Sequence, residues 1–169
     1  TRIHPLVISH GATVARTDRS RFHLEFDWTG TLDPSPYLCV PEAIRTLGAL
    51  LPGGWPALRA RNHSTALAAR QRLCAALGVP LPCPDDMIGS LATIPLPDAP
   101  APAAATWLAA DPLQETLLAR HGFEVPVFYW PAAPQRLVRL SAHLYNTAAQ
   151  YERLAEVLPA LVSRGAGAG

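Results

Sequence analysis

Apolar residues recur at helical spacing on both sides of a Pro-Gly-Gly break near residue 53. The segment from Pro34 to Leu51 has this spacing, and Ser35 followed by a proline is typical of a helix start. The segment from Pro56 to Leu77 predicts a second helix, and Gly78 is well suited to end it in the left-handed conformation. We expect the solvent-facing side of this helix to carry four arginines: Arg59, Arg61, Arg70 and Arg72.

Capping patterns predict two more helices. Asp111 is a favourable N-cap, a proline follows it, and Gln114 stands where a capping-box glutamine reaches back to the backbone. We expect this helix to end at Gly122. A second capping box runs from Thr147 to Gln150 and opens a helix whose apolar positions continue to Leu161.

Three runs rich in β-branched and aromatic residues predict strands. They are Met87 to Ile94, Glu124 to Trp130 and Leu137 to Ala142. A short Pro-Ala-Ala-Pro turn joins the last two, so we expect them to form an antiparallel pair. Pro126 lacks a backbone N–H and therefore places its strand at an edge or a bulge.

The beginning of the chain has weaker periodicity. The apolar run from Ile3 to Ser9 predicts a short strand, and a glycine follows it. Apolar and polar residues alternate from Phe22 to Asp27, which predicts a half-buried strand or extended loop within Arg16 to Asp33 that leads into a tight turn at Gly30. The Pro/Ala-rich segment from Pro95 to Ala105 is expected to be a loop.

The predicted order after residue 51 is helix, strand, helix, strand, strand, helix. This order indicates an α/β protein with a small α+β domain, in which helices cover a small antiparallel or mixed sheet. We expect residues 52–169 to form that domain. Residues 1–51 are expected to be the remnant of a larger domain together with a connecting helix, because the chain opens within an apolar run that has no preceding element.

The charges exclude some classes of partner. Fourteen basic and thirteen acidic residues are scattered along the chain, so no basic stripe is present that would follow a nucleic acid backbone. The apolar runs are far shorter than the ~20 residues that span a bilayer, so we expect no membrane segment. All fourteen basic residues are arginines, and without lysine no side chain can form a Schiff base.

The cysteines indicate an intracellular protein. Cys39, Cys74 and Cys83 are odd in number and have no C-x-x-C spacing, so neither a disulfide framework nor a zinc site is expected. Free thiols fit a reducing cytoplasm, which is our predicted location. The histidines and serines give no recognised metal pair and no Gly-x-Ser-x-Gly elbow, so no metal site and no hydrolase triad are predicted.

Two positions have the chemistry of a site for small anions. Arg139 lies in the middle of an apolar strand, which is unusual for a surface charge, and its planar guanidinium can hold a carboxylate with two hydrogen bonds. Thr31 follows Gly30 in the predicted turn, where a hydroxyl and backbone N–H groups can face an oxyanion. The alternatives are an edge-strand arginine with its head in water and an ordinary turn threonine.

Two motifs carry a family resemblance. The segment from Phe26 to Ser35 reads FDWTGTLDPS and resembles the Gly-Thr motif of class V aminotransferases. The segment from Val138 to Thr147 reads VRLSAHLYNT and resembles that family's Arg-x-Ser-x-x-x-Tyr-Asn-Thr segment. The chain therefore resembles the C-terminal part of a fold-type I enzyme that depends on pyridoxal 5'-phosphate (PLP). A tryptophan and prolines between Glu124 and Pro131 favour the isopenicillin N epimerase-like branch.

The resemblance implies how the site residues act. Arg139 would bind the carboxylate of an amino acid substrate, and Gly30 with Thr31 would contact the cofactor phosphate of the neighbouring subunit in a homodimer. The Schiff-base lysine of the family has no counterpart here, so no catalytic residue is assigned and the chain alone is expected to be inactive and to bind PLP weakly or not at all. A separately encoded lysine-bearing half is the other expected partner.

Several alternatives stay open for the reaction. The family implies proton removal at the α-carbon of an amino acid, as in an epimerase or a transaminase, and a carbon–sulfur lyase is the alternative. Cysteine desulfurases need a thiolate shortly before the arginine strand, and residues 125–131 contain no cysteine. A non-catalytic domain that binds an amino acid or docks on another subunit is a further alternative.

Overall fold

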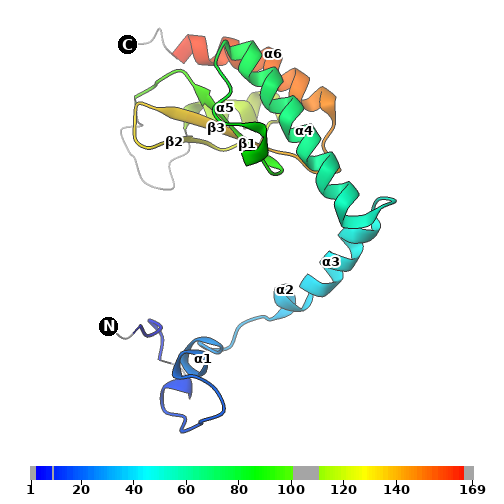
Figure 1. Cartoon of the computed structure of the whole chain (residues 1–169). Coiled ribbons are helices and arrows are strands. Elements are labelled where there is room, and N and C mark those ends of the chain that lie inside the picture. Colours follow the sequence, from blue (N-terminus) through cyan, green and yellow to red (C-terminus); the bar gives the residue numbers. More distant parts are fainter. Residues whose placement is uncertain (1–2, 9, 101–110, 166–169) are drawn as a thin grey trace. The chain divides into compact units, whose positions relative to one another are not determined.

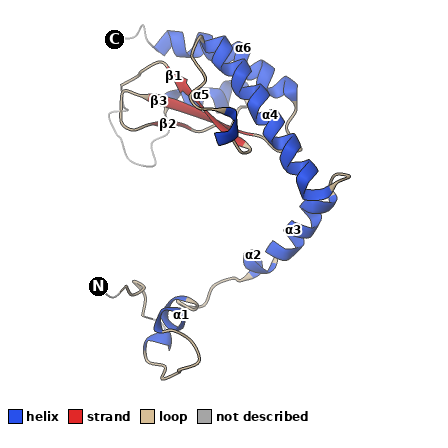
Figure 2. Ribbon diagram, in the orientation of Figure 1, coloured by secondary structure: helices blue, strands red, loops and turns tan. Residues whose placement is uncertain are grey.

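The computed structural model describes residues 3–8, 10–100 and 111–165. The chain divides into two compact units, Thr1–Thr46 and Leu47–Gly169. Figures 1 and 2 show the elements of both units. The predicted boundary after residue 51 refers to the domains of a whole enzyme and stays a prediction.

The second unit contains a three-stranded antiparallel sheet. Strands β1 (Leu91–Leu96), β2 (Val127–Tyr129) and β3 (Arg136–Ser141) lie in the order β1-β3-β2. The predicted antiparallel pair is confirmed, with Val127 opposite Val138. Strand β2 is an edge strand and begins directly after proline, as predicted.

The first strand is shorter at its start than the sequence predicted. Residues Asp85–Met87 form the 3-10 turn η2, so β1 begins only at Leu91. Its end also differs, because Pro95 and Leu96, which were assigned to a loop, belong to the strand. The rest of the predicted loop up to Pro100 has no regular structure, and residues 101–105 lie outside the described part.

Three helices build the core with this sheet. They are α4 (Gly54–Leu77), α5 (Pro112–His121) and α6 (Ala148–Gly165), and α4 packs against α6 and the sheet (Figure 1). Alternate residues of β1 and β3 are buried among the apolar side chains of these helices. In the part of the chain described here, none of the helices has the length and hydropathy needed to cross a bilayer.

The helix ends agree with most of the predicted caps. Gly78 follows α4 with φ 67°, and the Asp111 side chain accepts a hydrogen bond from the backbone N–H of Leu113 at 2.8 Å. The capping box predicted at Gln114 is wrong, because its side-chain oxygen accepts instead from the N–H of Val127 at 2.8 Å. This bond ties α5 to the start of β2.

One of the four arginines predicted to face solvent is fully buried. Arg70 in α4 has 0% exposure, and its guanidinium donates to the carbonyl oxygen of Cys83 at 2.9 Å and pairs with Asp85. Helical spacing alone placed it on the polar side. The loop after α4 folds back over this position, and such a contact between distant residues leaves no periodic signal.

Among the described residues of the first unit, all regular secondary structure is helical. It contains η1 (His10–Ala12), α1 (Arg21–Phe26), α2 (Ser35–Leu38) and the beginning of α3 (Val40–Ala49). The strand predicted from Ile3 to Ser9 is wrong for residues 3–8, which have no regular structure, and Ser9 is not among the described residues. A strand needs a pairing partner, and no other strand is present in the described residues of this unit.

The strand predicted around Phe22 is also wrong, because Arg21–Phe26 forms a helix. Ser20 caps it by accepting from the N–H of His23 at 3.3 Å. Two contacts at a spacing of four residues support the helical turn. The Arg21 guanidinium pairs with Glu25 at 2.7 Å, and the rings of Phe22 and Phe26 stack with their centroids 4.5 Å apart. These local contacts outweigh the alternating pattern.

The helix predicted from Pro34 to Leu51 is present but divided. Its first turn is α2, capped by Pro34 and not by Ser35, and Asp33 accepts a hydrogen bond from the N–H of Ser35 at 2.9 Å. Helix α3 begins at Val40, after Cys39 ends the first turn.

Candidate functional site

Arg139 lies in the central strand of the second unit. Its side chain is on the less buried face of the sheet, opposite Thr93, while its neighbours Val138 and Leu140 point into the core. Its backbone N–H donates to the carbonyl oxygen of Pro126 at 3.1 Å. Among the described residues, no carboxylate forms an ion pair with its guanidinium. Arg139 is therefore hydrogen-bonded through its backbone on both sides of the strand, and it is exposed.

A hollow of about 360 Å³ opens beside Arg139. Its walls come from the loop before β2, the end of β3 and the beginning of α6. The polar residues among its lining are Glu124, Arg139, Ser141, Tyr145, Asn146, Gln150 and Tyr151. The structure therefore brings the predicted arginine to a concave surface.

Hydrogen bonds fix the segment that connects β3 to α6. The side-chain oxygen of Asn146 accepts from the N–H of His143 at 3.0 Å, and that of Gln150 accepts from the N–H of Thr147 at 2.9 Å. The second bond is the Gln150 half of the capping box predicted from the sequence, while the N–H of Gln150 donates to the carbonyl oxygen of Thr147 at 3.1 Å. Tyr151 donates from its hydroxyl to the carbonyl oxygen of Ser141 at 2.7 Å, and burial raises the pKa of this phenol. These three hydrogen bonds connect residues that line the hollow to the backbone around them.

Gly30 and Thr31 lie in the first unit, in a bend after α1. Gly30 has φ 146°, a conformation that side chains rarely adopt. Both residues line a surface hollow of about 440 Å³ together with Trp28 and His10. The predicted turn is thus a bend at a concave surface.

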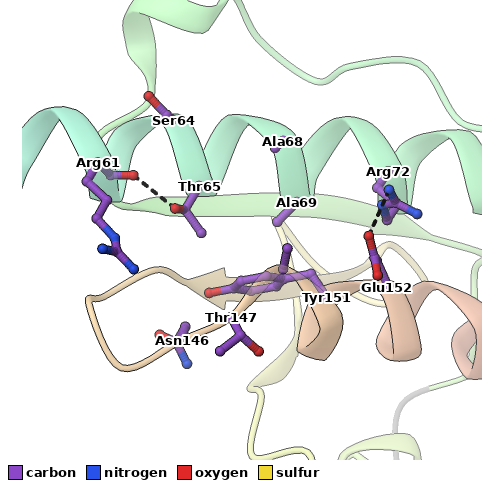
Figure 3. Close-up of a pocket in the computed structure, with 11 residues that line it drawn as sticks. Arg61, Ser64, Thr65, Ala68, Ala69, Arg72, Asn146, Thr147, Tyr151 and Glu152 are labelled. Atoms are coloured by element: carbon purple, nitrogen blue, oxygen red, sulfur yellow. Dashed lines mark hydrogen bonds and ion pairs between the residues drawn. The ribbon is translucent and has the colours of Figure 1, made fainter.

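Another hollow, of about 520 Å³, lies between α4 and the start of α6 (Figure 3). The Arg61 side chain extends from α4 toward the loop that carries Asn146, and Arg72 pairs with Glu152 at 3.1 Å. Ser64 and Thr65 donate their hydroxyl hydrogens to carbonyl oxygens of their own helix. The sequence assigned Arg61 and Arg72 only to a solvent-facing side and did not indicate this hollow.

A buried polar cluster was also missed by the sequence analysis. Asp111 accepts from the hydroxyl of Tyr129 at 2.9 Å and lies 3.3 Å from the guanidinium of Arg136. Asp111 and Arg136 are both buried. Burial, and then the hydrogen bond to Asp111, raises the pKa of Tyr129. These residues come from α5, β2 and β3, so no local sequence pattern could have joined them.

The described residues contain no group of three or more histidine, cysteine or acidic side chains that could hold a metal ion. The three cysteines are free, and Cys74 is buried, which raises the pKa of its thiol. The charged residues that line the hollow beside Arg139 are Glu124 and Arg139 itself.

Known proteins resemble the chain over most of its length. An isopenicillin N epimerase of Amycolatopsis lactamdurans is 35% identical over 147 residues, which are 86% of this chain and 33% of that protein. The corresponding protein of Streptomyces clavuligerus is 34% identical over 78% of this chain and 30% of its own length. A probable chloroplastic L-cysteine desulfhydrase of Arabidopsis thaliana is 27% identical over 92% of this chain and 34% of its own length. No family model matches the chain.

The two motifs and these relatives place the chain among the class V PLP-dependent enzymes. The chain belongs to the class V aminotransferase family, and its relatives there include both isopenicillin N epimerases and L-cysteine desulfhydrases. It spans about one third of the length of the relatives it matches.

Proposed function

We propose that this chain supplies the substrate-carboxylate site of a PLP-dependent enzyme that acts at the α-carbon of an amino acid. The observation that carries this proposal is Arg139, whose guanidinium is free of ion pairs with the described residues and borders a hollow. A strand arginine that served only solubility would need no concave surface beside it. The proposed reaction is that of the family. The proposed site rests on the position of Arg139 beside the hollow in this chain.

The fixed backbone of Arg139 matters for the reaction. The bond that breaks at the α-carbon must be held at a set angle to the cofactor ring, so the carboxylate of the substrate needs a fixed partner. A guanidinium binds a carboxylate in one plane with two hydrogen bonds, and this fixes rotation as well as position. Hydrogen bonds to β1 on one side and to Pro126 on the other hold the strand that carries it.

The first unit fits one part of the cofactor. A positive φ at Gly30 followed by the Thr31 hydroxyl at a concave surface suits a phosphate group, and a Cβ added at Gly30 meets no atom within 4 Å. The chain does not fit the covalent attachment, because it contains no lysine. PLP, when bound, withdraws electrons from the α-carbon of an attached amino acid. We therefore propose that Gly30 and Thr31 contact the cofactor phosphate, and that PLP binds weakly or not at all to this chain alone.

The proposed function also requires a partner that supplies the missing lysine. We propose that a lysine-bearing partner completes the site, either in a homodimer of the whole enzyme or as a separately encoded half. The group that moves the α-proton would belong to that partner, while this chain holds the substrate. A cytoplasmic location remains part of the proposal.

A second candidate reaction is the cleavage of a carbon–sulfur bond. It is favoured by the relatives named L-cysteine desulfhydrase, which match 92% of this chain at 27% identity. The role of Arg139 would be the same in both reactions, because both begin with a fixed amino acid carboxylate. An amino-acid-binding domain without catalysis would use the same residue.

The test is a titration of the chain with L-alanine and with L-alaninamide, followed by NMR. We expect L-alanine to cause saturable shifts and the amide, which lacks the carboxylate, to bind at least about tenfold more weakly. Arg139→Gln should remove this difference. Arg59→Gln, at an exposed position of α4, is the matched control and should preserve it. Equal binding of both ligands to the unaltered chain would refute the proposal.

A further inference from the structure

The side-chain amides of Asn146 and Gln150 line the same hollow as Arg139. Their oxygens are already engaged, since each accepts a hydrogen bond from a backbone N–H. A backbone N–H can only donate, so the atom that faces it must be the amide oxygen and not the nitrogen. The orientation of both amides is thereby fixed.

This orientation leaves two NH2 groups with hydrogens to donate. Within the described part of the chain, neither NH2 group donates a hydrogen bond to another residue. The lining of the hollow therefore includes Arg139, two residues whose amide NH2 groups are unused, and the carboxylate residue Glu124. Asn146 also lines the hollow between α4 and α6. Neutral donors match acceptor oxygens without requiring a second negative charge.

We propose that Asn146 and Gln150 determine substrate specificity by donating hydrogen bonds to a neutral acceptor oxygen in the side chain of the amino acid held by Arg139. This inference rests on the proposed function of Arg139. The Arg139 guanidinium is matched by the α-carboxylate of the substrate. The negative charge of Glu124 disfavours a further carboxylate, so the acceptor is the oxygen of an uncharged group such as an ester or an amide.

The test compares two L-amino acids of equal side-chain length. L-Glutamate γ-methyl ester has a neutral acceptor group, and L-2-aminoheptanoate has only methylenes and a methyl group in its place. We expect the 169-residue chain, titrated by NMR, to bind the ester about two- to tenfold more tightly, which is the usual effect of one hydrogen bond. Equal affinities in the unaltered chain would overturn the inference.

The variants Asn146→Asp and Gln150→Glu replace the donating NH2 by oxygen and keep the oxygen that caps the backbone. We expect each to reduce the preference for the ester and the double variant to abolish it. Gln135→Glu makes the same change of charge at an exposed position outside the lining of the hollow, and it should preserve the preference. A preference that survives the double variant would also overturn the inference.

The role of Arg139 is tested separately in the same titration. Arg139→Gln should weaken both ligands, because both have the α-carboxylate. If it weakens neither, or if no ligand gives a saturable shift, the proposed function fails and this inference fails with it. If it weakens both while the unaltered chain shows no preference for the ester, only the inference about Asn146 and Gln150 fails.

Discussion

Two arginines inside the second unit are bound to carboxylates in different surroundings. Arg136 faces Asp111, and both side chains are buried. Arg70 has 0% exposure, but the side chain of its partner Asp85 is 54% exposed. Arg70 therefore attaches the loop after α4 to the helix, while the carboxylate that balances it remains in contact with water.

Removing Arg70 should be costly for this reason. We predict that Arg70→Ala lowers the free energy of unfolding by about 3 kcal/mol, because it removes a buried charged hydrogen bond to Cys83 and leaves a cavity. Urea unfolding followed by circular dichroism measures the change. Arg72→Ala is the control, since its partly exposed pair with Glu152 should contribute less than about 1 kcal/mol. Similar losses in both variants would contradict this account of Arg70.

The residue scale also shows what the sequence could reveal about the candidate site. Arg139 could be predicted as a site residue because one short segment contains both signals: a charge within an apolar strand and a family motif. Asn146 lay in the same motif but had no predicted role, and Glu124 was read only as part of a strand. Their place in one hollow depends on how three separate elements pack, so no single stretch of sequence records it.

At the scale of elements, helix ends were predicted better than strands. The caps at Gly78, Asp111 and Thr147 depend on residues within a few positions of one another, and the structure has all three helices. The strand predicted from Ile3 to Ser9 depended on a distant partner and is absent from residues 3–8. Helix α1 was missed because its alternating pattern concealed contacts four residues apart.

The end of α4 provides a test of a single backbone conformation. Gly78 has φ 67°, and a Cβ added there meets no atom within 4 Å. We predict that Gly78→Ala lowers the free energy of unfolding by about 1 kcal/mol, through the left-handed backbone alone. Gly89→Ala is the control, because its Cβ also meets nothing and its φ is not positive. Thermal unfolding should show a lower midpoint for the first variant only.

At the scale of the molecule, the sequence predicted the class of fold and the family. The second unit is an α/β domain with an antiparallel sheet, and the relatives confirm the family. The strands predicted in the first unit are wrong, since its described elements are helical. The chain matches about a third of the length of each of these relatives.

The lack of lysine leads to a prediction for the isolated chain. In D2O with PLP, the α-proton of L-alanine should exchange no faster with the chain than with PLP alone, because no side chain can take the place of the Schiff-base lysine. Proton NMR measures the loss of the α-proton signal. Exchange faster than in the protein-free control would show that the chain is catalytic by itself. Adding a lysine-bearing partner should accelerate the exchange, and the Arg139→Gln variant should reduce this acceleration.

Asp111 accepts hydrogen bonds from the beginning of α5, from Tyr129 of β2 and from Arg136 of β3. A change at any one of these positions leaves the others with an unmatched donor or acceptor in the interior. Natural relatives should therefore either keep the acid, the phenol and the guanidinium together or replace them as a group. Substitutions at this junction should therefore occur together and not one at a time.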